Sequence, residues 1–198
     1  MKKTPGFASN PGRAPSRRIQ ARRSGVHGRG VYALVDLGEG ETLIEYTGEI
    51  IDWPEALRRH PHDPAQPNHT FYFHIDDDRV IDANVGGNTA RWINHSCAPN
   101  AIAFVHEHKS GKAKKEKVII EALRDIEADE EITYDYGFEF DVPYTKKLLS
   151  IWACRCGAPN CTGTMLKPKK KEGRKASTGK GTAGKKNASP VKAKRSGN

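Results

Sequence analysis

The four cysteines constrain this chain more than any other feature. Cys154, Cys156 and Cys161 fall within eight residues with the spacing C-x-C-x4-C, and Cys97 lies far upstream in RWINHSCAPN. A structural zinc site uses four protein ligands, and three thiolates leave one position open. Because Cys97 is the only other thiol, we predict one structural zinc that fixes the C-terminal segment to the Cys97 loop. The alternative is that Cys97 is a small buried apolar residue and the other three are incidental.

The redox environment bears on this interpretation. The chain begins MKK, but Pro5, Ser9, Asn10 and Pro11 follow where a signal peptide has its apolar stretch. No segment reaches transmembrane length, so we expect no membrane association. These features predict a cytosolic protein, in which disulfides are rare and clustered cysteines favour a metal.

The two ends of the chain differ from its middle. Residues 1–16 hold three prolines and a charge of +3, and residues 167–198 hold twelve Lys/Arg against one Glu, or +11. The total is +9, so residues 17–166 carry −5. Neither end has enough apolar residues to fold, so we predict a basic disordered arm and a Lys-rich disordered tail. An acidic body favours a cationic substrate, although it could simply aid solubility, and the basic tail favours nucleic acid.

The body reads as a single, mostly β domain. Short segments rich in β-branched and aromatic residues predict strands at Thr42–Ile51, Thr70–Ile75, Ala101–Val105, Lys117–Leu123 and Glu131–Tyr136. A short helix is expected over Asp52–His60, with Asp52 as its cap, and another within NVGGNTARWINHS. The segment His108–Lys117 reads as an exposed, basic hairpin loop.

Five motifs in register resemble the SET-domain family of protein-lysine methyltransferases. They are SGVHGRGVYA, EYTGEII, FHIDDDRVIDANVGGNTARWINHSCAPN and DEEITYDYGF, followed by CRCGAPNCTG, which resembles the zinc-binding post-SET segment. The resemblance covers residues 17–166 and implies a SET domain at 17–140 and a post-SET segment at 141–166. It implies several small β-sheets, with NHSC and ITYDY forming a pseudoknot. Residues 1–16 hold no cysteine, so we expect the pre-SET module of some relatives to be absent.

The resemblance also implies S-adenosylmethionine as cofactor. The positions that match cofactor-binding residues of the family are His27, Gly28, Arg29, Gly30, Phe71, Asn94, His95, Tyr136 and Arg155. Considered alone, HGRG could be a tight turn, Asn94–His95 a local cap, and Arg155 a solvent-facing cation. Phe71 stands where many relatives have an active-site tyrosine, and Tyr72 is expected on the opposite face of its strand.

Three tyrosines match the family's catalytic positions. The resemblance implies that the Tyr136 hydroxyl lies near the transferring methyl, that Tyr46 hydrogen-bonds the substrate amine, and that Tyr134 helps to set the number of methyls added. Tyr134 and Tyr136 are two residues apart and should share one face, which fits a pocket or a core patch equally well. A tyrosine at position 134 predicts mono- or dimethylation.

The predicted function is S-adenosylmethionine-dependent lysine methylation of a basic protein, histone or histone-like, and the chain's own tail is a further candidate substrate. The tail would also tether the protein to nucleic acid, at the nucleoid in a bacterium or on chromosomes in a eukaryotic nucleus. The rival hypothesis is a nucleic-acid-associated binding protein with a degenerate SET body, because the tail alone supports both.

Overall fold

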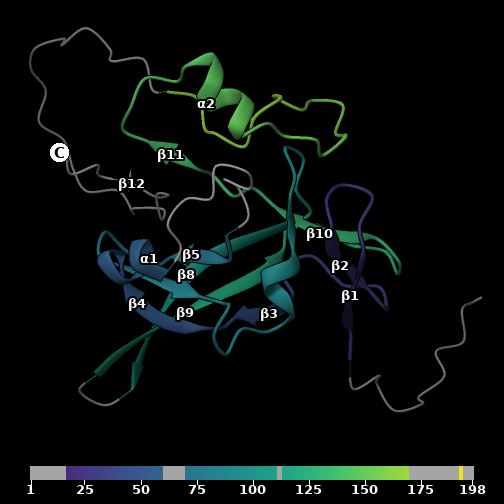
Figure 1. The fold of residues 1–198 in the computed structure, drawn as a ribbon. Coiled ribbons are helices and arrows are strands. Elements are labelled where there is room, and N and C mark those ends of the chain that lie inside the picture. The colour runs from purple at the N-terminus through teal and green to yellow at the C-terminus, as the bar shows by residue number, and fades with distance from the viewer. Residues whose placement is uncertain (1–16, 60–69, 111–112, 170–191, 194–198) are drawn as a thin grey trace, which may run out of the picture.

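The computed structural model describes residues 17–59, 70–110, 113–169 and 192–193, and its strands form several small sheets (Figure 1). They pack around a main core and a second, smaller one. The predicted disordered arm at 1–16 lies outside the described residues, as does most of the predicted tail. Within the described residues, no helix is long and apolar enough to cross a membrane.

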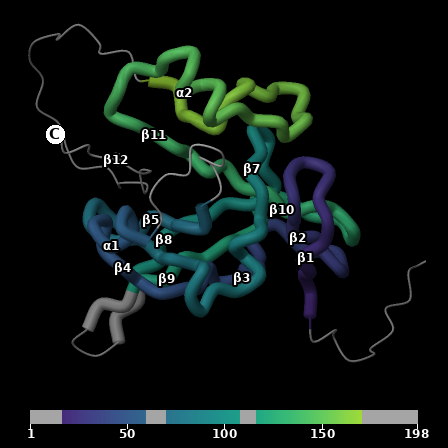
Figure 2. Tube along the Cα trace, viewed as in Figure 1, coloured from purple at the N-terminus to yellow at the C-terminus, as the bar shows by residue number. Residues whose placement is uncertain are grey.

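The first sheet brings together segments far apart in the sequence. Its order is β1-β2-β10-β7, with bounds Ile19–Arg23, Arg29–Ala33, Glu131–Tyr134 and Asn94–His95. The strands β7 and β10 run parallel, so that Asn94 lies opposite Thr133 and His95 opposite Tyr134. Figure 2 shows the two strands side by side. The expected pairing of the NHSC and ITYDY segments is therefore confirmed.

The second and third sheets share the stretch that was predicted as one strand. The second has the order β3-β9-β8, with bounds Thr42–Tyr46, Ala113–Ala122 and Ala101–Ser110. The third has the order β4-β6-β5, with bounds Glu49–Asp52, Arg79–Asp82 and Tyr72–His74. The single strand expected over Thr42–Ile51 was wrong, because the chain changes sheets at Thr47–Gly48. A Cβ on Gly48 would lie 2.5 Å from the Asp82 carbonyl oxygen, so the two backbones approach here as only glycine permits.

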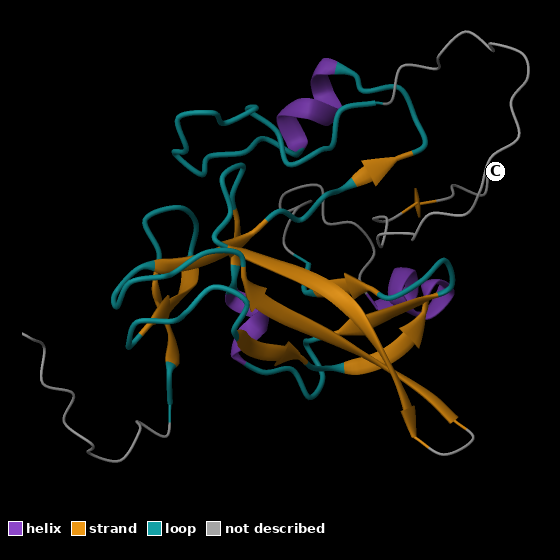
Figure 3. Ribbon diagram, turned by 180° about the vertical axis from the view of Figure 1, so that it is seen from behind, coloured by secondary structure: helices purple, strands orange, loops and turns teal. Residues whose placement is uncertain are grey.

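The expected loop over His108–Lys117 was also wrong. Strands β8 and β9 stay in antiparallel register from Ala101↔Ala122 to Ser110↔Ala113, so only residues 111–112 lie between them. An unbroken register satisfies each backbone pair in turn, which lets the ladder run to the tip. This hairpin projects from the body (Figure 3).

The helical elements are short. Helix α1 (Trp53–Arg59) confirms the first predicted helix, and the Glu55 N–H donates to the Asp52 carboxylate as a cap (2.9 Å). The second prediction corresponds to a 3-10 turn, η1 (Thr89–Trp92). Helix α2 (Lys146–Ile151) lies in the cysteine-containing C-terminal segment. Just before that segment, β11 (Glu139–Phe140) pairs in parallel with β12 (Lys192–Ala193).

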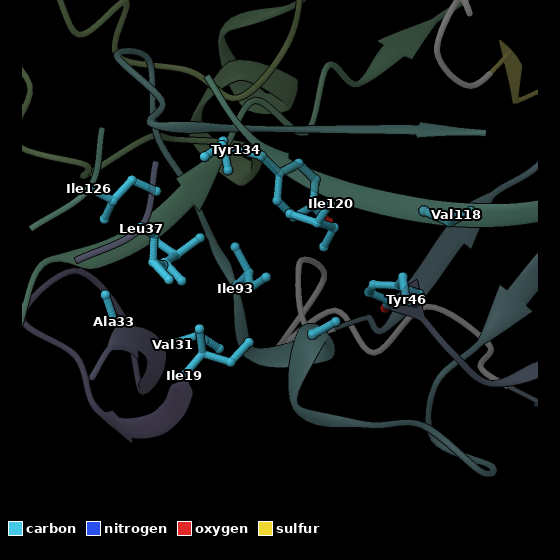
Figure 4. Packing of buried hydrophobic residues seen from close by; sticks show 14 of the residues in the cluster. Ile19, Val31, Ala33, Leu37, Tyr46, Ile93, Val118, Ile120, Ile126 and Tyr134 are labelled. Atoms are coloured by element: carbon cyan, nitrogen blue, oxygen red, sulfur yellow. The ribbon is translucent and has the colours of Figure 1, made fainter. Parts of the chain in front are cut away.

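The main hydrophobic core holds two of the tyrosines that the sequence singled out. Buried side chains from the first two sheets and from the end of η1 meet there, including Val31, Ile93, Val118 and Ile120 (Figure 4). Tyr46 and Tyr134 belong to the same cluster. The two tyrosines are therefore held by the most buried part of the molecule.

Candidate active site

A pocket of about 160 Å³ lies where β3, β5, β8 and the end of β10 meet. Its walls include all three tyrosines that the sequence singled out, Tyr46, Tyr134 and Tyr136. Phe73 adds an aromatic wall, with its ring centroid 5.2 Å from that of Tyr46 and 6.3 Å from that of Tyr134. The aromatic rings in its wall suit contact with the methylene chain of a lysine.

Tyr46 is held by its own hydroxyl. This residue ends β3, and its O–H donates to the carbonyl of Phe71 at 2.9 Å. Burial is the main cause that raises its pKa well above the ordinary value, so the phenol is neutral. The hydroxyl proton is donated to the Phe71 carbonyl, and the lone pairs of the hydroxyl oxygen can still accept a hydrogen bond.

Tyr134 and Tyr136 share the pocket, which confirms that they face the same side. Their ring centroids are 5.0 Å apart. The Tyr136 hydroxyl donates to the Ile93 carbonyl (2.8 Å), and its backbone N–H donates to Nδ1 of His95 (3.1 Å). Burial raises the pKa of both phenols far above the ordinary value. Neither is therefore a phenolate base at neutral pH.

The side chain of Asn94 hydrogen-bonds to the backbone of the HGRG turn. Its amide nitrogen donates to the carbonyls of Arg29 (2.9 Å) and His27 (3.4 Å) and to Glu131 (2.7 Å). Gly28 has φ +48°, which favours glycine. His27 and Arg29 are exposed, so their side chains line the surface of the turn. The structure thus brings the two sequence-predicted cofactor elements into direct contact.

Phe71 belongs to an aromatic and cationic cluster. Its ring packs edge-on against Trp92 with centroids 4.9 Å apart, and the Arg91 guanidinium lies 5.5 Å from the Phe71 centroid. Arg29 covers the ring of Trp92 at 5.0 Å. Tyr72 packs in a second, smaller core cluster formed by residues of α1, β4 and β6, and its hydroxyl donates to the Ala56 carbonyl (3.1 Å). Phe71 and Tyr72 therefore pack in different core clusters, as the alternation along a strand predicts, but it is Tyr72 and not Phe71 that is among the residues lining the pocket.

The four cysteines converge, as their count predicted. Their sulfur atoms all lie within 4.8 Å of one another. Cys97 Sγ is 3.7 Å from Cys154 Sγ and 3.9 Å from Cys161 Sγ. Four sulfurs at Zn–S distances of about 2.3 Å in a tetrahedron are roughly 3.8 Å apart, so the donor set fits zinc. Arg155, between two of these cysteines, is exposed.

Glu131 is the site residue that the sequence analysis missed. Its carboxylate accepts hydrogen bonds from Ser24, Tyr32 and Asn94. A Cβ on Gly30 would lie 2.0 Å from Glu131 Oε1, so the close approach that Gly30 permits is to this carboxylate. The signal available in the sequence was a glutamate inside a predicted strand of apolar and aromatic residues.

Comparison with known proteins places these features in a family. The SET domain family model matches residues 28–137. The chain is 42% identical over 144 residues to a protein of Eremothecium gossypii named histone-lysine N-methyltransferase, H3 lysine-4 specific, and 40% identical to a protein of Saccharomyces cerevisiae with the same name. The matches span 72% of this chain and 14% and 13% of those relatives.

A solved structure supports the same relationship. The structure named ctPRC2 in an autoinhibited conformation bound to S-adenosylmethionine superposes with a TM-score of 0.54 at 30% identity. The superposition covers 68% of this chain and 17% of that one.

Proposed function

The chain belongs to the SET-domain family, and on this premise we propose that it is an S-adenosylmethionine-dependent protein-lysine N-methyltransferase. The observation that carries the proposal is the pocket walled by Tyr46, Tyr134 and Tyr136, adjoining the paired residues Asn94 and His95. A binding module without chemistry would not need three neutral phenols gathered on one narrow pocket.

The cofactor would be held by the turn at 27–30, by Asn94 and His95, and by Arg155. It supplies an electrophilic methyl group on a sulfonium centre. The residues of the chain bind it, orient it and exclude water. The backbone of the turn is exposed for contact where Gly28 adopts its positive φ. The aromatic face of Tyr136 would separate this site from the pocket, and its hydroxyl oxygen would present lone pairs toward the reacting centre.

The pocket would prepare the lysine. An amine with a pKa of about 10.4 is protonated at neutral pH and is not a nucleophile in that state. A desolvated channel next to a cation lowers that pKa and favours loss of the proton to solvent before attack. The Tyr46 oxygen, whose own proton is donated to Phe71, would accept an N–H of the amine and aim its lone pair. Alignment then provides much of the rate.

The cysteine cluster would hold one structural zinc, with Cys97, Cys154, Cys156 and Cys161 as ligands. Such a site would fix the segment 141–166 beside β7. Its role in the proposal is positional, because four thiolates leave no open coordination site for chemistry.

The proposed substrate is a lysine-rich protein, histone or histone-like. The similarity to enzymes named as specific for lysine 4 of histone H3 supports this class, as does the charge of −5 on residues 17–166. The tail would retain the protein on nucleic acid, on chromosomes in a nucleus or at a bacterial nucleoid, and its lysines are candidate substrates themselves. We propose mono- or dimethylation as the product.

The rival function, a nucleic-acid-associated protein with an inactive body, is favoured by one observation, the charge of +11 on residues 167–198. The deciding experiment is incubation with radiolabelled S-adenosylmethionine and purified histones, with Tyr136→Phe as the matched inactive variant. Methyl transfer that is lost in the variant supports the enzyme. No transfer to any histone, together with no calorimetric binding of the cofactor, would establish the rival.

A further inference from the structure

Glu131 connects three segments that surround the proposed cofactor site. Its carboxylate oxygens accept from the Ser24 hydroxyl at 2.9 Å, from the Tyr32 hydroxyl at 3.0 Å and from the Asn94 amide at 2.7 Å. The three donors come from the turn after β1, from β2 and from β7. In every contact the side chain of Glu131 accepts, as an ionised carboxylate does.

These contacts continue into the HGRG turn. The Ser24 hydroxyl accepts from the N–H of Val26 (2.9 Å) and more weakly from that of His27 (3.4 Å). The Asn94 amide that binds Glu131 also binds the Arg29 carbonyl at 2.9 Å. A single carboxylate thus anchors both ends of the turn, and Gly30 leaves it room to do so.

The charge of Glu131 has no cationic partner. All three of its donors are neutral, and among the described residues no arginine or lysine forms an ion pair with it. The adjacent Glu130 differs, because Arg124 pairs with it at 2.6 Å and the Asn100 amide donates to it at 2.8 Å. The charge of Glu131 also extends to the pocket, where it contributes to the raised pKa of Tyr136. A negative charge left uncompensated by the protein favours a cation bound nearby.

We propose that Glu131 is the positioning residue of the cofactor site and the counter-charge that selects the cationic methyl donor over its neutral demethylated product. The inference rests on the proposed function. It assigns two separable effects to one carboxylate, since its hydrogen bonds order the turn and Asn94, whereas its charge distinguishes a sulfonium from a thioether. The consequence is easier product release, because methyl transfer removes the charge that Glu131 attracts.

The test measures calorimetric affinities of the full-length, zinc-loaded protein for three ligands. S-adenosylmethionine and sinefungin are cationic at the position of interest, and S-adenosylhomocysteine is neutral there. Glu131→Gln should weaken both cations about tenfold more than it weakens the neutral ligand. A charge pair separated by roughly 12 Å at an effective dielectric of about 20 already has an effect of this size.

Two further variants keep the test decisive. Glu131→Asp keeps the negative charge on a side chain that is shorter by one methylene group, so its hydrogen bonds to the turn should weaken. The affinities for all three ligands should then fall together, and the ratio of cationic-ligand to neutral-ligand affinity should stay near that of the wild type. Glu130→Gln is the matched control and should leave the ratio unchanged. Equal losses for cationic and neutral ligands in Glu131→Gln, or no loss, would overturn the inference. Absence of cofactor binding by the wild type would instead overturn the proposed function itself.

Discussion

The backbone N–H of Tyr136 donates a 3.1 Å hydrogen bond to Nδ1 of His95. An N–H can only donate, so Nδ1 is the acceptor nitrogen, and in the neutral ring Nε2 carries the proton. Burial lowers the pKa of His95 and favours this neutral form. Nε2 lies 3.6 Å from Cys97 Sγ. One imidazole therefore connects the cysteine cluster to the residue proposed to lie at the transferring methyl.

This connection makes metal content and activity interdependent. We expect one zinc per chain in the wild type, and Cys97→Ser should lose it, because three thiolates and a hydroxyl bind zinc far less well. Activity should fall with the metal as the segment 141–166 loosens. Metal analysis by mass spectrometry checks the stoichiometry. Thr162→Val is the control, since Thr162 lies 3.5 Å from Cys97 Sγ but the variant retains all four thiols. A wild type without zinc, or Cys97→Ser with undiminished zinc, would contradict the prediction.

The Tyr136 hydroxyl is expected to matter more for rate than for folding. Tyr136→Phe leaves the Ile93 carbonyl without its 2.8 Å donor, which costs about 1–3 kcal/mol, and removes the oxygen aimed at the reacting centre. We expect kcat to fall at least about tenfold while zinc content stays at the wild-type value. Peptide methylation under saturating cofactor measures this. Tyr144→Phe, a tyrosine outside the pocket, should retain its rate, and an equal loss in both variants would show a general effect on folding.

Stability should decrease on the acid side of neutrality, partly through His74. Burial lowers the pKa of its ring, and its Nε2 accepts from Trp53 Nε1 at 3.3 Å, while Asp76 and Asp77 oppose the shift. The folded-state pKa lies below the unfolded value of about 6.5, so the unfolded chain takes up the proton first and stability falls as pH drops through that value.

The matched variant is His74→Gln, whose amide oxygen can still accept from Trp53. Between pH 7.5 and 5.5 it should lose less free energy of unfolding in urea than the wild type. His106→Gln, at an exposed position on β8, should follow the wild-type curve. Identical pH slopes for His74→Gln and the wild type would show that His74 contributes nothing to the acid sensitivity.

Deletion of the tail tests its predicted affinity for nucleic acid. The Lys167 N–H donates to the Phe138 carbonyl at 2.8 Å, so a truncation before Lys167 would remove a contact of the body. Deletion of residues 170–198 leaves that contact, although it removes β12 and its pairing with β11, and it removes ten Lys/Arg against one Glu. Retention on DNA should then fall sharply and lose its steep salt dependence, because counterion release drives such binding. Methylation of a free peptide should persist. Equal DNA binding with and without these residues at moderate salt would refute the prediction.

Two kinds of site feature could be predicted from the sequence: the metal site, from the number of cysteines, and the side of a strand on which each aromatic residue lies, from the alternation of side chains. The four thiols had to meet if they bound one metal, and their sulfurs do converge. Side chains alternate along an extended strand, so Tyr134 and Tyr136 were expected on one face and Phe71 and Tyr72 on opposite faces, and the structure has both arrangements.

The features that could not be predicted are contacts between segments that lie far apart in the sequence, because local patterns do not show which segments meet. Nothing local distinguishes Gly48, which lies between β3 and β4 against the backbone of Asp82, from a glycine in a turn. The Asn94 amide looked free for a ligand, whereas the fold uses it to hold the carbonyls of the HGRG turn. Glu131 was only the first residue of a predicted strand, and nothing in the local sequence indicates that β2 and β7 flank that strand on either side.

Product multiplicity depends on the space beside Tyr134. Its ring is buried between Phe73 and Tyr136, with centroid distances of 6.3 Å and 5.0 Å, so a methylated amine must turn within a confined volume before a second in-line attack. A phenol there occupies that volume or holds water in it, and phenylalanine would free it. Loss of one buried hydrogen bond of about 1 kcal/mol changes a partition roughly fivefold. We therefore expect the wild type to stop at one or two methyls and Tyr134→Phe to proceed further.

The measurement is the product distribution on one peptide by mass spectrometry at long incubation, with Tyr144→Phe as the control that should match the wild type. Predominant trimethylation by the wild type would refute this account of Tyr134, whatever the two variants did.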